Sequence, residues 1–335
     1  MFLEAGQAAQ AVRDQLLANA REMQRLGERL RQEAPRAVVT CARGSSDHAA
    51  TFAKYLIETR LGVLTSSAAP SVSSVYGAEP DLSSAVCLAI SQSGASPDLI
   101  AAVGKAREAG ALIVALVNAV DSPLARIAHH LVPLCAGRER SVAATKSFIA
   151  SLAAIVHLVS SWADDRTLSE ALRQAPKQLE RAWSLDWRGA VERLRSTTDL
   201  YVIGRGLGLG VAQEAALKLK ETCGLHAEAL SGAELRHGPM ALVRAGFPVL
   251  VLSQDDEARA GLERLAAELA AREADVMIAG ARVRGALSLP VEAGHPAIEP
   301  MLLAQSFYRM ANALSVARGL DPDRPPNLSK VTETV

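Results

Sequence analysis

Hydrophobic residues recur through the first thirty residues at the spacing of an amphipathic helix. Most of the positions between them carry arginine, glutamate or glutamine, so one side of such a helix is buried while the other stays in water. The pattern predicts a cover helix within residues 1–34 that precedes the first strand. Its apolar positions are Val12, Leu16, Ala20, Met23, Leu26 and Leu30.

From residue 37 the pattern changes to short apolar runs that alternate with alanine-rich helical stretches. Strands that alternate with helices predict βαβ units, and therefore a parallel sheet covered by helices on both faces. Helical segments follow at about 144–163 and 167–196, and we interpret the second, more polar one as a linker. The predicted strands are AVVTCA, VLTSSA, AVCLAIS, LIVALVN and HLVPLC.

The strand pattern then begins again, which indicates an internal repeat. Arg43 follows the first predicted strand, and Arg205 stands in the same place 162 residues later (205 − 43). Ser91 closes another strand, and Ser253 recurs at the same offset of 162 (253 − 91). The apolar run at 112 also has a counterpart at 275 in nearly the same register.

A chain of 335 residues is long enough to bury two cores of similar size. We therefore predict two tandem α/β domains, at 35–165 and 197–335, joined by a linker at 166–196. The copies differ after the Ser-Gln pair, because the first continues with serine and glycine and the second with Asp255 and Asp256. Carboxylates repel an anion, so we expect only the first copy to bind a phosphate at this tip.

Composition and charge narrow the possible functions. Lys plus Arg and Asp plus Glu number 36 each, so no global positive field attracts nucleic acid or an anionic membrane. No apolar run approaches the roughly 20 residues of a membrane-spanning helix, and the first residues lack the order of a secretion signal. The cysteines and histidines show no metal-ligand spacing. We expect a cytoplasmic protein without nucleic-acid, membrane or metal partners.

The segment SQSGASPD, residues 91–98, follows a predicted strand and opens a helix. Ser96 suits the N-cap and Pro97 the first helical position, while Gly94 would let a phosphate approach the backbone N–H groups closely. A capped helix after a serine-rich turn is the simpler interpretation. The position favours a ligand, because ligands bind beyond the carboxyl ends of parallel strands.

A second strand-to-helix turn, RGSSDHA, spans residues 43–49. Ser45 or Ser46 in this turn either caps the helix or binds the same phosphate. Arg43 either adds positive charge near the phosphate or supports the loop. A second serine turn next to the first favours a phosphate site more strongly than either turn would alone.

The helix predicted at 212–221 places Glu214, Lys218 and Glu221 on one face. A solvated ion-pair ladder is the usual meaning of such spacing, but this helix begins just after a strand end. A carboxylate there, next to a lysine, is a candidate base for a carbon acid. His237 is a second candidate, because the adjacent glycine and proline end a helical segment and imidazole is a common proton donor and acceptor in catalysis.

Six motifs together resemble the sugar-isomerase (SIS) family of phosphosugar enzymes, which includes the isomerase domains of glucosamine-6-phosphate synthase. The resemblance implies two tandem SIS domains, each a parallel five-stranded sheet in a flavodoxin-like, three-layer α/β arrangement. Because one helix precedes the first strand, we expect no glutaminase activity; the chain is most similar to stand-alone SIS-type glucosamine-6-phosphate deaminases. The motifs are ARGSSDHA, SQSGASPD, SVAATKSF, EAALKLKE, HAEALSGAELRHGP and PPNLSK.

The resemblance also implies roles for individual residues. Glu221 would move a proton between C2 and C1, and Lys218 would assist at the sugar oxygen. His237 would open the pyranose ring in the neighbouring subunit of a homodimer, and Lys330 would contact the open-chain sugar. Ala144 stands where the synthase has serine. The implied contacts to the substrate and its phosphate are Ser45, Ser46, Ser91, Gln92, Ser93, Ser96, Val142, Ala144 and Glu214.

The expected reaction is therefore the conversion of glucosamine 6-phosphate to fructose 6-phosphate and ammonia, with no metal or organic cofactor. Another ketose/aldose phosphate isomerase and a fructosamine-6-phosphate deglycase remain alternatives, because both would keep the same turns and base. A non-catalytic sugar-phosphate-binding regulator is the alternative from another class.

Overall fold

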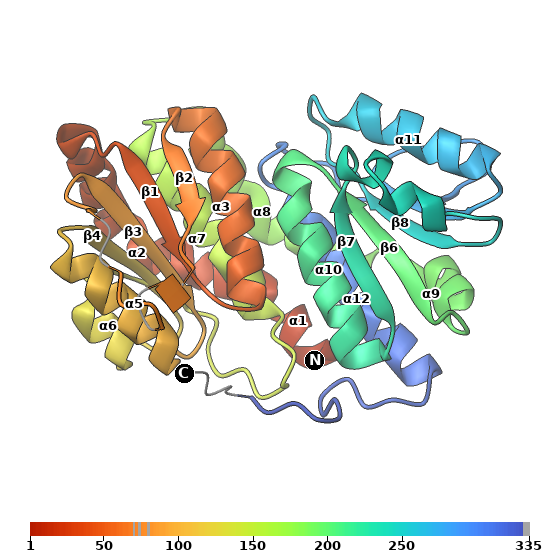
Figure 1. Ribbon diagram of the computed structural model, residues 1–335, viewed down its shortest axis with the longest axis horizontal. Helices are drawn as coiled ribbons and strands as arrows, with labels where there is room; N and C mark the ends of the chain where they lie inside the picture. Colours follow the sequence, from red (N-terminus) through yellow and green to blue (C-terminus); the bar gives the residue numbers. More distant parts are fainter. Residues whose placement is uncertain (70, 73–74, 79–80, 331–335) are drawn as a thin grey trace. The chain divides into compact units, whose positions relative to one another are not determined.

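A computed structural model describes residues 1–69, 71–72, 75–78 and 81–330 (Figure 1). The described chain forms two compact units, and each contains one parallel sheet. The first-sheet unit comprises Gln10–Glu139, Lys146–Pro176 and the tail residues Ser329 and Lys330. The second-sheet unit comprises Met1–Ala9, Arg140–Thr145 and Lys177–Leu328.

The first sheet has the order β2-β1-β3-β4-β5, and all of its pairings are parallel. Strand β3 lies at its centre and is buried along its whole length, as its uninterrupted apolar sequence predicts. The strands are β1 (Ala37–Cys41), β2 (Leu64–Ser67), β3 (Ala85–Ser91), β4 (Leu112–Val117) and β5 (His130–Pro133).

Helices cover both faces of the first sheet. Helices α5 (Pro97–Glu108) and α6 (Pro123–Ile127) share one buried cluster with alternate residues of β3 and β4. Helix α3 (Ser45–Leu61) packs on α7 (Lys146–Trp162) and on β2. A right-handed crossover from β1 to β2 and another from β3 to β4 leave the sheet in opposite directions, so α3 and α5 lie on opposite faces.

The N-terminal helical region divides into α1 (Phe2–Gly6) and α2 (Ala8–Glu33). The predicted apolar stripe on α2 is partly correct, since Met23, Leu26 and Leu30 are fully buried but Ala20 is exposed. Two polar side chains share the buried face. Gln15 donates to the carbonyl oxygens of Leu134 and Ala150, and Asn19 donates to that of Pro133.

The second sheet has the order β10-β9-β8-β6-β7 and repeats the first. Taken from β7, the order is the flavodoxin-like 2-1-3-4-5 in both sheets. The offset of 162 extends to other boundaries, because β1 and β6 begin at 37 and 199 and α5 and α11 begin at 97 and 259. The predicted tandem repeat is therefore confirmed. The strands are β6 (Asp199–Gly204), β7 (His226–Ser231), β8 (Pro248–Leu252), β9 (Asp275–Ala279) and β10 (Leu287–Leu289).

Helices also cover both faces of the second sheet (Figure 1). Helix α11 (Arg259–Ala271) shares a buried cluster with alternate residues of β6, β8 and β9. Helix α10 (Leu209–Cys223) packs on β6, β7 and α12 (Glu299–Ala317). The segment predicted as one polar linker forms two helices, α8 (Arg166–Ser184) and α9 (Arg188–Leu194), and α9 packs on α12 and β10.

Among the helices within the described ranges, none combines the length and the hydropathy that a membrane crossing requires.

Candidate functional site

The serine-rich turn lies between β3 and α5, where the sequence places it. The Ser91 hydroxyl accepts a hydrogen bond from the Gly94 amide at 2.9 Å, and the Ser93 hydroxyl accepts one from the Ala95 amide at 3.3 Å. A hydroxyl that accepts still has its own proton to donate. Ser96 occupies the N-cap position of α5 without a side-chain cap, and Gln92 is half-buried beside it.

Gly94 has a packing role in addition to the one expected. Its φ is +60°, which favours glycine, and a Cβ there would lie 2.1 Å from the Ser122 hydroxyl oxygen. The space beside Gly94 is thus filled by the loop after β4, whose Leu124 amide also donates to the Gly94 carbonyl. Packing between two protein segments is therefore enough to require this glycine, and the close approach of a phosphate stays a prediction.

The turn after β1 joins the serine-rich turn through an ion pair. Arg43 donates from Nε and Nη2 to Oδ2 of Asp98, both at 2.8 Å, and the Asp98 side chain is buried in the first turn of α5. Arg43 therefore supports the loop. Gly44 is the N-cap of α3, so the alternative that Ser45 or Ser46 caps this helix is wrong; both are half-buried in its first turn.

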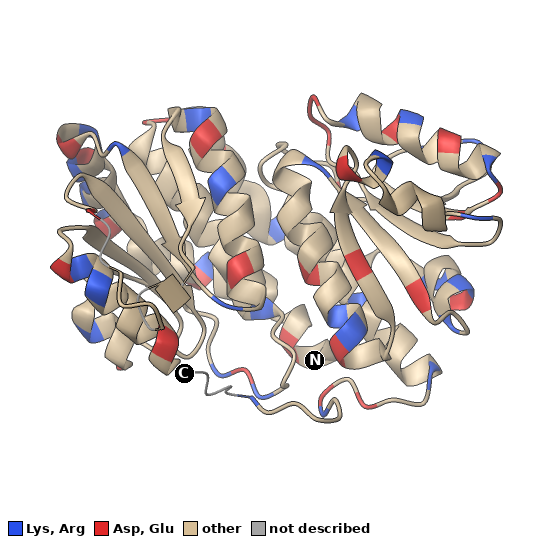
Figure 2. Ribbon diagram, viewed as in Figure 1, with Lys and Arg blue, Asp and Glu red and all other residues tan. Residues whose placement is uncertain are grey.

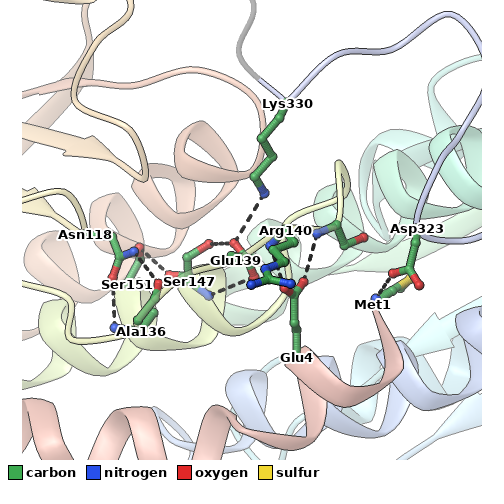
Figure 3. Close-up of polar contacts among 12 residues, drawn as sticks. Met1, Glu4, Asn118, Ala136, Glu139, Arg140, Ser147, Ser151, Asp323 and Lys330 are labelled. Atoms are coloured by element: carbon green, nitrogen blue, oxygen red, sulfur yellow. Dashed lines mark hydrogen bonds and ion pairs between the residues drawn. The ribbon is translucent and has the colours of Figure 1, made fainter.

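Lys330 in the C-terminal tail pairs with a buried carboxylate of the same unit (Figure 3). Its Nζ lies 3.8 Å from Oε2 of Glu139, whose side chain is fully buried. Glu139 also accepts a hydrogen bond of 2.6 Å from the hydroxyl of Ser147, in the first turn of α7. The sequence analysis missed Glu139, and its place in the loop just before SVAATKSF was the available indication.

Val142 and Ala144 lie in the segment 140–145 of the second-sheet unit, where both are half-buried. The Val142 amide donates to the Asp323 carbonyl at 3.3 Å. Glu4 accepts from the amides of Arg140 and Ser141, which ties the same segment to α1 (Figure 3). The loop is therefore held from both ends of the chain.

Helix α10 carries a buried lysine between two carboxylates, which confirms that the three predicted residues share one face. Nζ of Lys218 lies 3.6 Å from Oε1 of Glu214 and donates to Oε2 of Glu221. Lys218 and Glu214 are each 1% exposed at the side chain, while Glu221 is 19% exposed. A solvated ion-pair ladder is therefore excluded.

Glu214 is also fixed from a second helix. The Tyr308 hydroxyl in α12 donates to Oε1 of Glu214 at 2.9 Å, and Tyr308 is fully buried. The sequence analysis missed this residue, although a hydroxyl within an apolar helix usually needs a buried partner. With Glu214 held by Lys218 and Tyr308, Glu221 is the carboxylate of this cluster that keeps access to solvent.

His237 lies apart from this cluster on a short turn. The segment before it forms strand β7 and a short 3₁₀ helix, Glu234–Arg236, with His237 as its C-cap just before Gly238. The expected helical segment is therefore only one short turn. The imidazole is exposed and lines a cavity of about 270 Å³ in the second-sheet unit. The other lining residues are Arg205, Gly232, Ala233, Arg236, Gly261, Leu262, Arg264 and Leu265.

The corresponding tip of the second sheet is filled by its own carboxylates. The Asp255 amide donates to Glu299 at 2.6 Å, and the Ala258 amide donates to Asp256 at 2.9 Å. Burial raises the pKa of the Glu299 carboxyl. Amides that an anion would use are thus already bonded, which gives a physical basis for the expectation that this tip is a poor phosphate site.

Metal-ligating residues do not gather in the part of the chain that the structure describes: no group of three or more His, Cys, Asp or Glu has a suitable arrangement there.

Comparison with known families matches one family model, the SIS domain, at residues 32–161 and 193–279. Among curated relatives, the glutamine–fructose-6-phosphate aminotransferase (isomerizing) of Aeropyrum pernix is 36% identical over 310 residues, which cover 86% of this chain and 49% of the relative. That of Sulfolobus acidocaldarius is 35% identical over 298 residues, covering 88% and 49%. The chain spans about half the length of these relatives.

Comparison with solved structures identifies proteins that share the fold of this chain. A protein of Silicibacter pomeroyi, provisionally classed as a phosphosugar isomerase, matches with 43% identity and a TM-score of 0.93 over 96% of this chain and 99% of its own. The C-terminal domain of the glucosamine-fructose-6-phosphate aminotransferase of Francisella tularensis matches with 25% identity and a TM-score of 0.87, over 96% and 97%. The glucosamine-6-phosphate deaminase of Thermotoga maritima, at 23% identity and a TM-score of 0.74 over 97% and 100%, shares the fold.

Proposed function

Because this chain belongs to the SIS-domain family, we propose that it is a phosphosugar isomerase that converts glucosamine 6-phosphate and water to fructose 6-phosphate and ammonia. The names of the curated relatives specify fructose 6-phosphate and an isomerising reaction, which supports this substrate class. The release of ammonia from glucosamine 6-phosphate is a more specific claim than the substrate class, and it is part of this proposal.

One observation carries the proposal: a buried lysine holds a partly exposed carboxylate on α10. Lys218 is 1% exposed and contacts Glu221, the more exposed acid of the cluster. A solvated surface ion pair adds little stability. Burying an ammonium between two acids costs desolvation free energy, so stability alone does not explain this arrangement. A fixed carboxylate beside a proton donor is what proton transfer between neighbouring carbons requires.

The phosphate would bind at the turn between β3 and α5. Hydroxyl protons of Ser91, Ser93 and Ser96 are suitable donors, and the Ser45–Ser46 turn of the neighbouring strand adds two more. Arg43 pairs with Asp98, so its role is to hold the two turns together. The serine residues would chiefly set affinity, because they contact a part of the substrate that does not react.

The chemistry would proceed on the open-chain sugar. His237, from the neighbouring subunit, promotes ring opening, and Glu221 takes the proton from C2 of the aldehyde. Return of a proton to C1 produces an imine at C2, which water hydrolyses to the ketone with release of ammonia. Lys218 assists at the sugar oxygen. Lys330, positioned by Glu139, contacts the open-chain sugar.

We expect the enzyme to act as a cytoplasmic homodimer, because the proposed role of His237 requires a second subunit. Val142 and Ala144 would contact the sugar from the 140–145 loop. Alanine at 144 has no hydroxyl to offer the sugar, so any contact from this position would be apolar.

The proposal is tested by ammonia release from glucosamine 6-phosphate, with fructose 6-phosphate measured as co-product. We expect Glu221→Gln to lower kcat by about 10²- to 10⁴-fold, the usual contribution of a positioned acid or base, with little change in substrate affinity. Glu228→Gln is the matched control, because Glu228 is an exposed acid on β7.

Ammonia release at the same rate from wild type and Glu221→Gln would remove Glu221 as the base. Absence of ammonia, together with interconversion of another aldose and ketose phosphate, would assign a different sugar. Binding of sugar phosphate without any turnover would assign a regulator.

A further inference from the structure

The cavity that contains His237 has a strongly positive lining. Three of its nine lining residues are arginines, Arg205, Arg236 and Arg264. Arg236 pairs with Glu268, which Arg272 also contacts. Arg205 and Arg264 have no hydrogen bond or ion pair from their side chains to any residue that the structure describes.

The internal repeat explains why Arg205 is unpaired. Its counterpart in the first half is Arg43, which is neutralised by Asp98 in the second position of α5. Helix α11 begins 162 residues after α5 (259 − 97), so the second position of α11 is Ala260. The second copy has thus kept the arginine and lost the carboxylate.

The guanidinium of Arg205 still lies beside the first turn of the helix. A Cβ placed on Gly261 would be 3.9 Å from Nη1 of Arg205 and would meet nothing else within 4 Å. The space beside Gly261, one residue after the counterpart of Asp98, is therefore open and next to the Arg205 guanidinium. An external anion that enters the cavity would supply the missing negative charge.

Three of the four acids just before α11 or in its first turns are already engaged, while Glu257 is exposed. Asp255 and Glu263 both pair with Arg259, and Asp256 accepts from the Ala258 amide and from Gln254. Asp255 and Glu263 are therefore paired with a cation and Asp256 is held by neutral donors, so none of the three pairs with Arg205 or Arg264.

We propose that this cavity is a second anion-binding site, distinct from the serine-rich turn, and that its ligand is a small phosphate monoester. Arginine presents several donors in a planar fork that matches phosphate oxygens, and two unpaired forks face one cavity. A volume of about 270 Å³ accommodates a phosphate group with a few carbons and is small for a dinucleotide.

One consequence rests on the proposed function. His237 lines the same cavity, so a bound phosphate would contact the imidazole that ring opening uses. Inorganic phosphate should therefore inhibit turnover through this cavity as well as by competition at the serine-rich turn.

The test uses substitutions at Gly261 and counts bound phosphate. Gly261→Asp places a carboxylate beside Arg205 in the open space, and Gly261→Ala adds the same Cβ without the charge. Equilibrium dialysis of the full-length chain with radiolabelled inorganic phosphate at low ionic strength should give the same binding for wild type and Gly261→Ala. Gly261→Asp should weaken one class of site at least about tenfold. Arg205→Gln should have the same effect without a change at Gly261.

Equal phosphate binding by Gly261→Asp and Gly261→Ala would overturn the proposal, as would normal binding by Arg205→Gln. Ser93→Ala provides the separation from the first site, since it should weaken the other class of site only. Failure of ammonia release would not change these counts, so the two proposals fail independently. Melting temperatures of all variants verify that each is folded.

Discussion

At the scale of single residues, two glycines in the same left-handed conformation differ in what surrounds them. Gly94 has φ +60° and Gly62 has φ +66°. A Cβ at Gly94 would overlap Ser122, whereas a Cβ at Gly62 would meet nothing within 4 Å. Backbone strain is therefore common to both positions, and steric overlap is confined to Gly94.

We predict that Gly94→Ala destabilises the protein by about 3 kcal/mol or more, while Gly62→Ala costs about 1 kcal/mol. Gly94→Ala should also weaken sugar-phosphate binding, because the serine-rich turn must move away from the loop after β4. Urea denaturation and substrate titration measure the two effects. Equal destabilisation by both substitutions would show that overlap with Ser122 is relieved at no cost.

His157 is a half-buried histidine in the apolar helix α7, and its Nδ1 is buried without a hydrogen-bond partner among the described residues. Burial lowers the pKa of its imidazole to about 4. The unfolded chain binds a proton at the ordinary, higher pKa, so stability is full above that pKa and is lost as the pH falls toward 4.

We predict that His157→Leu removes part of the acid sensitivity of folding. Relative to pH 7.5, the protonation of His157 in the unfolded chain should cost wild type about 2 kcal/mol at pH 5, and the variant should lack this loss. Melting curves between pH 7.5 and 4.5 provide the measurement, with His226→Leu, at an exposed position, as control. Parallel curves for wild type and His157→Leu would contradict the assignment.

At the scale of elements, the repeat provides a pair of arginines in equivalent places after β1 and β6. Arg43 neutralises buried Asp98 and so fixes the start of α5 against the turn before α3. Arg205 has no such partner at the start of α11. The same residue type therefore holds two elements together in one copy and not in the other.

We predict that Arg43→Gln costs about 2 kcal/mol, because the buried Asp98 would lose its two contacts with the guanidinium. Arg205→Gln should change stability by less than about 0.5 kcal/mol. Chemical denaturation of both variants makes the comparison. A larger loss of stability from Arg205→Gln than from Arg43→Gln would contradict this prediction. It would mean that the pair with Asp98 is not what makes Arg43 stabilising.

Elements were the most predictable level of this fold. Long apolar runs such as β3 and the 162-residue offset specify the strands and their repetition, because a fully buried parallel strand has few alternatives. Boundaries near glycine were less predictable. Residues 226–231 form strand β7, which was not among the predicted strands, because pairing with β6 outweighs the helix propensity of their alanine and glutamate residues.

At the scale of the whole molecule, the proposed role of His237 requires two subunits. His237 has no hydrogen bond to Glu214, Lys218 or Glu221 and lies in a separate cavity of the second-sheet unit. If it acts in a neighbouring site, each complete site combines Glu221 of one chain with His237 of another.

We predict that Glu221→Gln and His237→Asn, each nearly inactive alone, restore activity when they are unfolded together and refolded as a mixture. Random pairing makes half of the dimers mixed, and each mixed dimer has one complete site, so activity should return to roughly a quarter of wild type. Activity that stays at the level of the separate variants would mean that both residues serve the same chain.

The sequence by itself determined the tandem α/β architecture and the placement of the serine-rich turn, since both follow from local patterns that repeat at a fixed offset. It also determined that Glu214, Lys218 and Glu221 share a face, because helical geometry fixes that relation. Their roles as substrate-binding or catalytic residues stay predictions.

Only the tertiary structure decided which of these side chains are buried and what they contact. Partners distant in sequence, such as Tyr308 for Glu214 and Glu139 for Lys330, are selected by how helices and loops pack, and no local pattern encodes that choice. The same holds for Gly94, whose neighbour Ser122 lies on another loop. Local periodicity fixes elements, whereas burial and charge pairing depend on contacts between segments that only folding brings together.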